Sequence, residues 1–172
     1  MTVYVALLRA VNVGGTSKLP MADLKAMCVE AGYLQVQTYI ASGNVVFASK
    51  DQPANIKATL EGRLRSYAGK PVGVMVRTAK ELAAVLAANP FPNAAQNRTV
   101  VIFLDEPPTA NALADLKGRK DEDVRLGVRE IFVRYGEGIG SSRLVIPAAK
   151  SGTARNMNTV SKLVDLVARL SA

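Results

Sequence analysis

The order of apolar runs in the first half of the chain restricts its fold more than any other feature. Strands are predicted for four runs rich in β-branched and apolar residues: 2–8 (TVYVALL), 36–42 (VQTYIAS), 44–49 (NVVFAS) and 72–77 (VGVMVR). Residues 20–31 and 53–67 have apolar residues at helical spacing and follow the first and third runs. This β-α-β-β-α-β order predicts a ferredoxin-like subdomain over residues 1–77, with both helices on one face of an antiparallel sheet.

Glycine and proline mark the ends of these elements. Pro20 suits the first turn of a helix, and Gly32 suits a left-handed position just after its end. Ser42, Gly43 and Asn44 between two strands predict a tight hairpin turn, because Gly and Asn tolerate positive φ.

The second half contains the same kinds of elements. Helices are predicted at 78–91, 108–117 and 158–170, and strands at 99–104 and in two pieces within 123–136. We therefore expect an α+β protein in which residues 78–172 form a second, related α+β subdomain packed against the first as one compact unit. No sequence repeat establishes a duplication.

The composition excludes several kinds of chemistry. The chain of 172 residues has no histidine and one cysteine, so imidazole catalysis, zinc binding and an intrachain disulfide are not expected. Cys28 lies on an apolar helical stripe and is expected to be buried and inert. We predict no metal and no cofactor, and whether the protein is an enzyme stays open, with binding favoured over catalysis.

The charge balance favours an anionic partner. Twenty-two Lys and Arg residues against 14 Asp and Glu residues give a formal charge of +8. These charges are spread along the chain and form no basic arm. The apolar start is too short to span a bilayer and lacks the features of a signal peptide, so we expect a cytoplasmic protein without a membrane partner.

The loop after the first strand is the first candidate site. It contains Arg9, Asn12, Gly14, Gly15 and Lys18 ahead of a helix, so glycine N–H groups, the helix N-terminus and two cations could bind an anion. The motif matches neither GxxxxGK[ST] nor GxGxxG. The alternative is a simple turn in which Arg9 pairs with a carboxylate.

The stretch 151–162 (SGTARNMNTVSK) is the second candidate site. If Thr153 caps the last helix, Arg155 lies in its first turn, with Asn156, Asn158 and Thr159 nearby. A cation there opposes the helix dipole by about 0.3–1 kcal/mol, so an anion or an acidic partner would compensate it. The alternative is local capping with one surface ion pair.

Other motifs are less informative. Tyr4 and Phe47 could stack bases as in an RNA-recognition module, but aromatic residues are only 5% of the chain and we discount this reading. Carboxylates in LDEPP and KDEDV lie beside turns, where solvated charge is expected. The glycine-rich loop 135–143 is interpreted as either a lid or the end of a hairpin.

The chain resembles a bacterial family known as domain of unknown function 1697. The resemblance lies in LLRAVNVGG, MADLK, TYIASGNVVF, NPF and GTARNMNTVSKL, which span about residues 4–166. It implies a two-subdomain α+β fold whose first part is ferredoxin-like, and it implies no activity, substrate or catalytic residue. Many members have RNWNT where this chain has RNMNT, and Met157 on an apolar stripe suggests packing.

Three hypotheses follow. In the first, the loops converge on a cleft between the subdomains and bind a phosphate-bearing ligand such as a nucleotide or nucleic acid, with Ser42 and Asn44 joining the residues named above. In the second, these motifs are structural caps and turns without a ligand site. In the third, the same cleft hosts an enzyme that needs neither histidine nor metal. The oligomeric state is not predicted.

Overall fold

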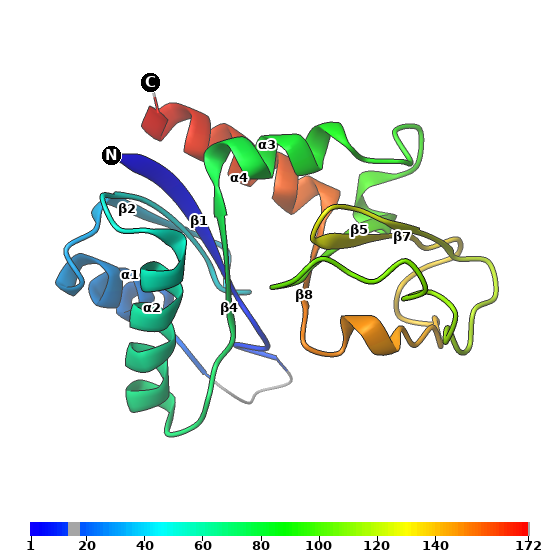
Figure 1. Cartoon of the computed structure of the whole chain (residues 1–172), viewed down its shortest axis with the longest axis horizontal. Coiled ribbons are helices and arrows are strands. Elements are labelled where there is room, and N and C mark those ends of the chain that lie inside the picture. Colours follow the sequence, from blue (N-terminus) through cyan, green and yellow to red (C-terminus); the bar gives the residue numbers. More distant parts are fainter. Residues whose placement is uncertain (14–17, 172) are drawn as a thin grey trace. The chain divides into compact units, whose positions relative to one another are not determined.

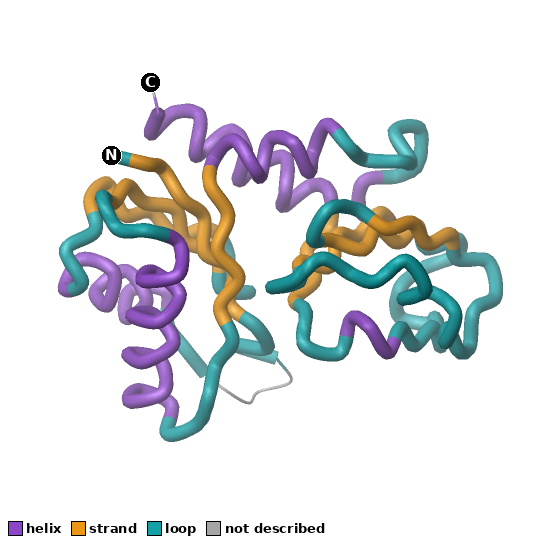
Figure 2. Tube along the Cα trace, in the orientation of Figure 1, coloured by secondary structure: helices purple, strands orange, loops and turns teal. Residues whose placement is uncertain are grey.

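The computed structural model describes residues 1–13 and 18–171 and has an α+β fold (Figures 1 and 2). The first sheet contains β1 (Thr2–Leu8), β2 (Leu34–Tyr39), β3 (Asn44–Ser49) and β4 (Val74–Thr78). The second sheet contains β5 (Thr99–Phe103), β6 (Asp123–Leu126), β7 (Glu130–Arg134) and β8 (Thr153–Asn156). The α-helices of this part of the chain are α1 (Met21–Glu30), α2 (Pro53–Ala68), α3 (Ala79–Ala87) and α4 (Met157–Ser171). Single 3₁₀ turns occupy Gln96–Arg98 and Pro147–Ala149.

The chain divides into two compact units. Unit 1 comprises Met1–Ala83 and Leu163–Ala172, and unit 2 comprises Ala84–Lys162. Helices α3 and α4 each cross the boundary between the units.

The sheet of unit 1 has the strand order β2-β3-β1-β4, and every neighbouring pair is antiparallel. The four strands and two helices predicted for residues 1–77 are all present, in the predicted order. Figure 1 shows α1 and α2 beside each other on one side of this sheet. Gly32 has a φ of +89° directly after the Ala31 C-cap of α1, as the sequence predicts for the end of that helix.

The core of unit 1 lies between this face of the sheet and the two helices. The strands contribute Tyr4, Ala6, Leu8, Val45, Phe47, Val74 and Val76, and the helices contribute Leu24, Met27, Cys28, Ile56, Leu60 and Leu64. Tyr33 stacks on Phe47, with ring centroids 4.5 Å apart. Because Tyr4 and Phe47 are buried beneath the helices, neither offers a surface on which bases could stack.

The sheet of unit 2 has the strand order β6-β7-β5-β8, also antiparallel throughout. Counted within its own unit, this is the same order as in unit 1, with the first strand between the third and fourth. One face packs against the loops that follow β5 and β7, through Leu113, Leu116, Leu144 and Ile146. Loop side chains thus fill the place that helices occupy in the first sheet.

The helix predicted at 108–117 is wrong, because this segment forms turns. The N–H groups of Ala112 and Ala114 donate to carbonyls three residues earlier, Thr109 and Asn111. The Thr109 hydroxyl also bonds Asn111 Oδ1 at 2.8 Å. Short polar side chains that bond locally compete with helix formation, and here tertiary packing of the leucines decides the outcome.

Candidate functional site

The predicted site residues lie in both units. Arg9, Asn12, Lys18, Ser42 and Asn44 belong to unit 1, whereas Arg155, Asn156, Asn158 and Thr159 belong to unit 2. Gly14 and Gly15 lie outside the described residues.

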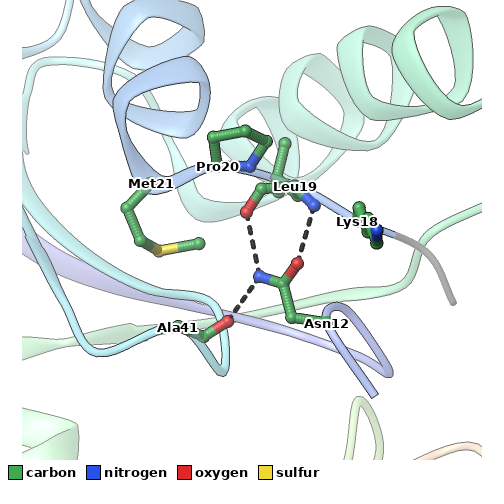
Figure 3. Close-up of a pocket in the computed structure, with 6 residues that line it drawn as sticks. All are labelled: Asn12, Lys18, Leu19, Pro20, Met21 and Ala41. Carbon is green, nitrogen blue, oxygen red and sulfur yellow. Dashed lines mark hydrogen bonds between the residues drawn. The ribbon is translucent and has the colours of Figure 1, made fainter. Parts of the chain in front are cut away.

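Asn12 is the structural centre of the first cluster. Its Nδ2 donates to the carbonyl of Leu19 at 2.9 Å and to that of Ala41 at 2.7 Å (Figure 3). Its Oδ1 accepts the N–H of Leu19 at 2.8 Å. The side chain thereby ties the entrance of α1 to the turn between β2 and β3. These bonds use both amide protons, so the group acts as a clamp.

Ser42 and Asn44 shape the turn between β2 and β3. The buried Asn44 donates through Nδ2 to the carbonyl of Tyr39 at 2.9 Å and to Ser42 Oγ at 3.0 Å. Gly43 lies between them with a φ of +90°, and its carbonyl accepts the N–H of Leu8 at 2.8 Å. A turn between the two strands is confirmed, with Gly43 at positive φ, but it spans residues 40–43, and Asn44 is the first residue of β3. The polar side chains of Ser42 and Asn44 close this turn.

Several residues near this clamp have a strained backbone conformation. Ala10, Asn12 and Ile40 all have positive φ, at 56°, 54° and 50°. Such a conformation costs about 1–3 kcal/mol, most for a β-branched residue such as Ile40. The loop after β1 and the turn before β3 are therefore held in one shape by surrounding contacts.

A cavity of about 450 Å³ opens beside the clamp at the start of α1. Its lining consists of Asn12, Lys18, Leu19, Pro20, Met21 and Ala41 (Figure 3). In the figure, Met21 and Asn12 lie on either side of the space between the first turn of α1 and Ala41. Four of the six lining residues are apolar, and Lys18 is exposed at the end of a described segment. The cavity thus combines apolar walls with one cation.

Arg9 is not among the residues that line the cavity beside Lys18. Its N–H donates to the carbonyl of Gly73 at 2.9 Å, and its aliphatic stem runs alongside that glycine, since a Cβ on Gly73 would contact Arg9 Cβ and Cδ at 3.6 and 3.7 Å. Arg9 therefore borders the segment that leads into β4.

The last helix begins at Met157, one residue before the predicted position, so Thr153 does not cap it and the interpretation of Arg155 that depends on that cap is wrong. Thr153 begins strand β8, and Asn156 caps α4 by accepting the N–H of Thr159 at 2.9 Å. Arg155 therefore lies in a strand, where it does not oppose the helix dipole. Asn158 is exposed on the first turn of α4.

Arg155 is a buried cation with only 7% of its surface exposed. Its Nη1 donates to Thr153 Oγ1 at 2.7 Å and to the carbonyl of Ala154 at 2.9 Å. Burial lowers the pKa of the guanidinium to about 10. Arg155 is thus buried, as a structural role would require, whereas Asn158 is exposed.

Unit 1 has a buried arginine at the equivalent position, which the sequence analysis missed. Arg77 is 1% exposed and lies opposite Val5 in β4, just as Arg155 lies opposite Val101 in β8. Nη1 of Arg77 donates to the carbonyl of Val76 at 3.1 Å, the same bond to the preceding residue that Arg155 makes.

The residues that directly follow Arg77 and Arg155 also have equivalent roles, because each caps a helix. Thr78 ends β4 and caps α3: its Oγ1 accepts the N–H of Glu81 at 3.1 Å, and its own N–H donates to Glu81 Oε1 at 2.9 Å. Asn156 ends β8 and caps α4 in the same place. The signal in the sequence was an arginine inside an apolar run, one residue before a helix cap.

The carboxylates of the KDEDV segment were expected to be solvated, which is wrong for Glu122, whereas Asp121 is exposed. Glu122 is 2% exposed, its Oε1 accepts the N–H of Lys120 at 2.6 Å, and its Oε2 accepts the hydroxyl of Ser142. The Ser142 hydroxyl is the main cause that lowers the pKa of Glu122. A carboxylate with a lowered pKa is a weak base, so this Ser–Glu pair is poorly suited to activating a nucleophile. It anchors the loop 135–143 instead.

Asp123 is also held in place. Its Oδ2 accepts Nε and Nη2 of Arg134 at 2.9 and 2.6 Å, and this pairing lowers the pKa of Asp123. Within residues 1–13 and 18–171, no group of three or more Cys, Asp or Glu side chains is placed to hold a metal ion. The helices of the same residues include none with the length and apolar character needed to cross a membrane.

Comparison with known proteins identifies the family. The model of a protein family of unknown function, DUF1697, matches residues 1–132, and the chain belongs to this family. No curated protein matches the chain. Its structure is similar to that of the conserved bacterial protein SP0830 from Streptococcus pneumoniae, with a TM-score of 0.80 and 26% sequence identity. The match covers 96% of this chain and 98% of the other.

Proposed function

We propose that the protein binds a small phosphate-bearing molecule, of the size of a nucleotide, in the cavity at the start of α1. The observation that carries this proposal is the cavity of about 450 Å³ with apolar walls and Lys18 at its edge. Ligand sites are commonly apolar concavities with a few polar groups that fix orientation. Leu19, Pro20 and Met21 would contact the apolar part of such a ligand, and Lys18 its charge.

Two further features support an anion at this place. The N–H groups of Met21 and Ala22, in the first turn of α1, make no hydrogen bond within the described residues, whereas those of Asp23 and Leu24 bond the carbonyl of Pro20. A helix N-terminus with open N–H groups favours negative charge. The Asn12 clamp holds the opposite wall, so a ligand would meet a preformed surface.

The structural hypothesis accounts for the remaining polar residues. Asn12, Ser42, Asn44 and Asn156 are engaged in turns and caps, and we assign them positioning roles rather than ligand contacts. For unit 1 we also propose the ferredoxin-like class, which its element order and the β2-β3-β1-β4 strand order support.

The test is a titration of the intact protein with nucleoside mono-, di- and triphosphates, sugar phosphates and a short oligonucleotide, followed by calorimetry. Lys18→Ala is expected to weaken binding about 10-fold, the contribution of a hydrogen bond to a charged group. Lys25→Ala, which removes the same charge from the exposed side of α1, is the matched control and should bind normally. The proposal fails if no compound binds or if the two variants bind equally well.

A further inference from the structure

A second concave surface of unit 1 lies between α2 and the segment that leads into β4. It is a groove of about 280 Å³ lined by Glu61, Gly62, Arg65, Pro71, Val72 and Gly73. None of these residues lines the cavity beside Lys18. The groove is therefore a separate feature of the surface, and none of its residues was singled out from the sequence.

Gly62 is the first unusual feature of this groove. It lies in the interior of α2, where glycine costs about 0.5–1 kcal/mol relative to alanine. Its φ is not positive, and a Cβ built on it would meet nothing within 4 Å. Neither backbone conformation nor packing requires glycine here. What glycine does at this position is keep the floor of the groove free of a side chain.

The carboxylate of Glu61 in the groove is paired with a cation. Glu61 Oε2 accepts Lys57 Nζ at 2.8 Å and the N–H of Val74 at 3.0 Å. Lys57 Nζ also donates to the carbonyl of Val74 at 2.7 Å. These bonds fasten α2 to the start of β4, which gives the groove a fixed wall. The positive charge of Lys57 also offsets the negative charge of Glu61, which would otherwise repel an anion.

Arginine supplies the positive charge. Arg65 lies one helical turn after Glu61 on the same face of α2, is exposed, and makes no side-chain hydrogen bond or ion pair within the part of the chain that the structure describes. The Arg9 stem runs along Gly73, which also lines the groove. A planar guanidinium with several donors is well matched to the oxygens of a phosphate.

We propose that this groove binds the phosphoryl group of a small molecule, with Arg65 as the direct contact and Gly62 as the residue that leaves room for it. The bound oxygens would lie against the helix surface at Gly62 and accept hydrogen bonds from Arg65. Close approach of backbone to a ligand is a recognised reason for glycine in an element where it is otherwise unfavourable.

The test uses calorimetric titration of the full chain with inorganic pyrophosphate at near-physiological salt. Arg65→Ala is expected to weaken binding about 10- to 100-fold. Gly62→Leu is expected to abolish binding by filling the groove while leaving the thermal midpoint equal or higher, because the new side chain has space and improves helix propensity. A raised midpoint with lost binding is a combination that a purely structural role for Gly62 does not produce.

The controls separate this site from general charge and from the Lys18 cavity. Arg63→Ala removes an equal charge from α2, at an exposed pair with Glu30 3.3 Å apart, and should bind pyrophosphate like the parent protein. Lys18→Ala should also retain pyrophosphate binding at the groove, so either proposal can fail without the other. Absence of pyrophosphate binding, binding unaffected in Gly62→Leu, or equal loss in Arg63→Ala and Arg65→Ala would each overturn the inference. Binding of a short oligonucleotide by a protein that does not bind pyrophosphate would also overturn the inference.

Discussion

At the scale of single residues, Gly43 and Gly32 have nearly the same backbone conformation and very different surroundings. Their φ angles are +90° and +89°. A Cβ on Gly43 would lie 2.7 Å from Val11 Cγ2 and 2.8 Å from Leu8 Cβ, whereas one on Gly32 would have nothing within 4 Å. The pair therefore separates the strain of positive φ from that of overpacking.

We predict that Gly43→Ala lowers the free energy of unfolding by about 2–4 kcal/mol, the sum of backbone strain and an overpacked core. Gly32→Ala should lower it by about 1 kcal/mol, from strain alone. Urea denaturation followed by circular dichroism measures both. Equal losses in the two variants would show that the clash at Gly43 relaxes without cost.

Cys28 gives a prediction for chemical reactivity. Burial in the core of unit 1 raises the pKa of its thiol to about 12. We expect a thiol-specific disulfide reagent to leave the native protein unmodified at pH 8 and to label one thiol in urea. Because the folded pKa lies above that of the unfolded chain, this group stabilises the fold below pH 9, and that contribution is lost as the pH rises from about 9 toward 12. Rapid native labelling would contradict the buried placement.

Side chains that must form hydrogen bonds were easier to predict from the sequence than the groups to which they bond. The amide of Asn12 and the guanidinium of Arg155 were recognisable as groups that must form hydrogen bonds. That Asn12 bonds Leu19 and Ala41, rather than a ligand, depends on a turn 29 residues away in sequence. Arg77 was missed because an arginine in an apolar run, one residue before a helix cap, is a weak signal until its strand is placed in a sheet.

At the scale of elements, the start of α4 shows how one misplaced cap changes the interpretation of several residues. Thr153 and Asn156 are both good cap residues, and the sequence alone favours neither strongly. The four residues Thr153–Asn156 become β8 because they pair with β5, a contact about 50 positions away that local sequence does not reveal. The apolar stripe of α4 and the buried Met157 at its start were predictable from spacing alone.

We predict that Asn156→Ala lowers the free energy of unfolding by about 1 kcal/mol, because the N–H of Thr159 loses its acceptor. Asn156→Asp should retain most of the stability, since an aspartate accepts the same bond and suits a helix N-terminus. Thermal denaturation of the three proteins checks this ordering. If the aspartate variant is as unstable as the alanine variant, the residue has a role other than capping.

The pairing of β6 with β7 predicts an acid-side dependence of stability. Arg134 lowers the pKa of Asp123 in the folded protein, so the pair contributes stability above the unfolded pKa of about 4. This contribution is lost as the pH falls through the folded value. We expect the unfolding free energy of Asp123→Asn to vary less between pH 5 and pH 2, roughly the range of carboxyl titration, than that of the parent. Parallel profiles for the two proteins would show that the pair is too solvated to matter.

At the scale of the whole molecule, the two sheets share a strand order that the sequence did not reveal. The helix predicted at 108–117 is replaced by turns, so the second half lacks a helix between its first two strands and the two series of elements differ. The equivalence appears only in the strand pairing and in the position of Arg77 and Arg155 before a capped helix. An α+β class was predictable from alternating periodicities, whereas this correspondence depends on long-range register.

The net charge of +8 gives a final prediction that distinguishes site binding from general attraction. A basic protein attracts polyanions through many weak contacts, and the affinity falls steeply as salt displaces the released counterions. A compact ligand held by Lys18 or Arg65 in a cavity is screened less, because part of its surface leaves water.

We therefore expect the affinity for heparin or duplex DNA to fall by about 100-fold or more between 50 and 200 mM salt, as for a protein with several phosphate contacts. Nucleotide or pyrophosphate binding should weaken by less than about 10-fold over the same range. Calorimetry or fluorescence anisotropy at four salt concentrations measures both slopes. Equal slopes would mean that the small anions bind the surface charge and not the two cavities.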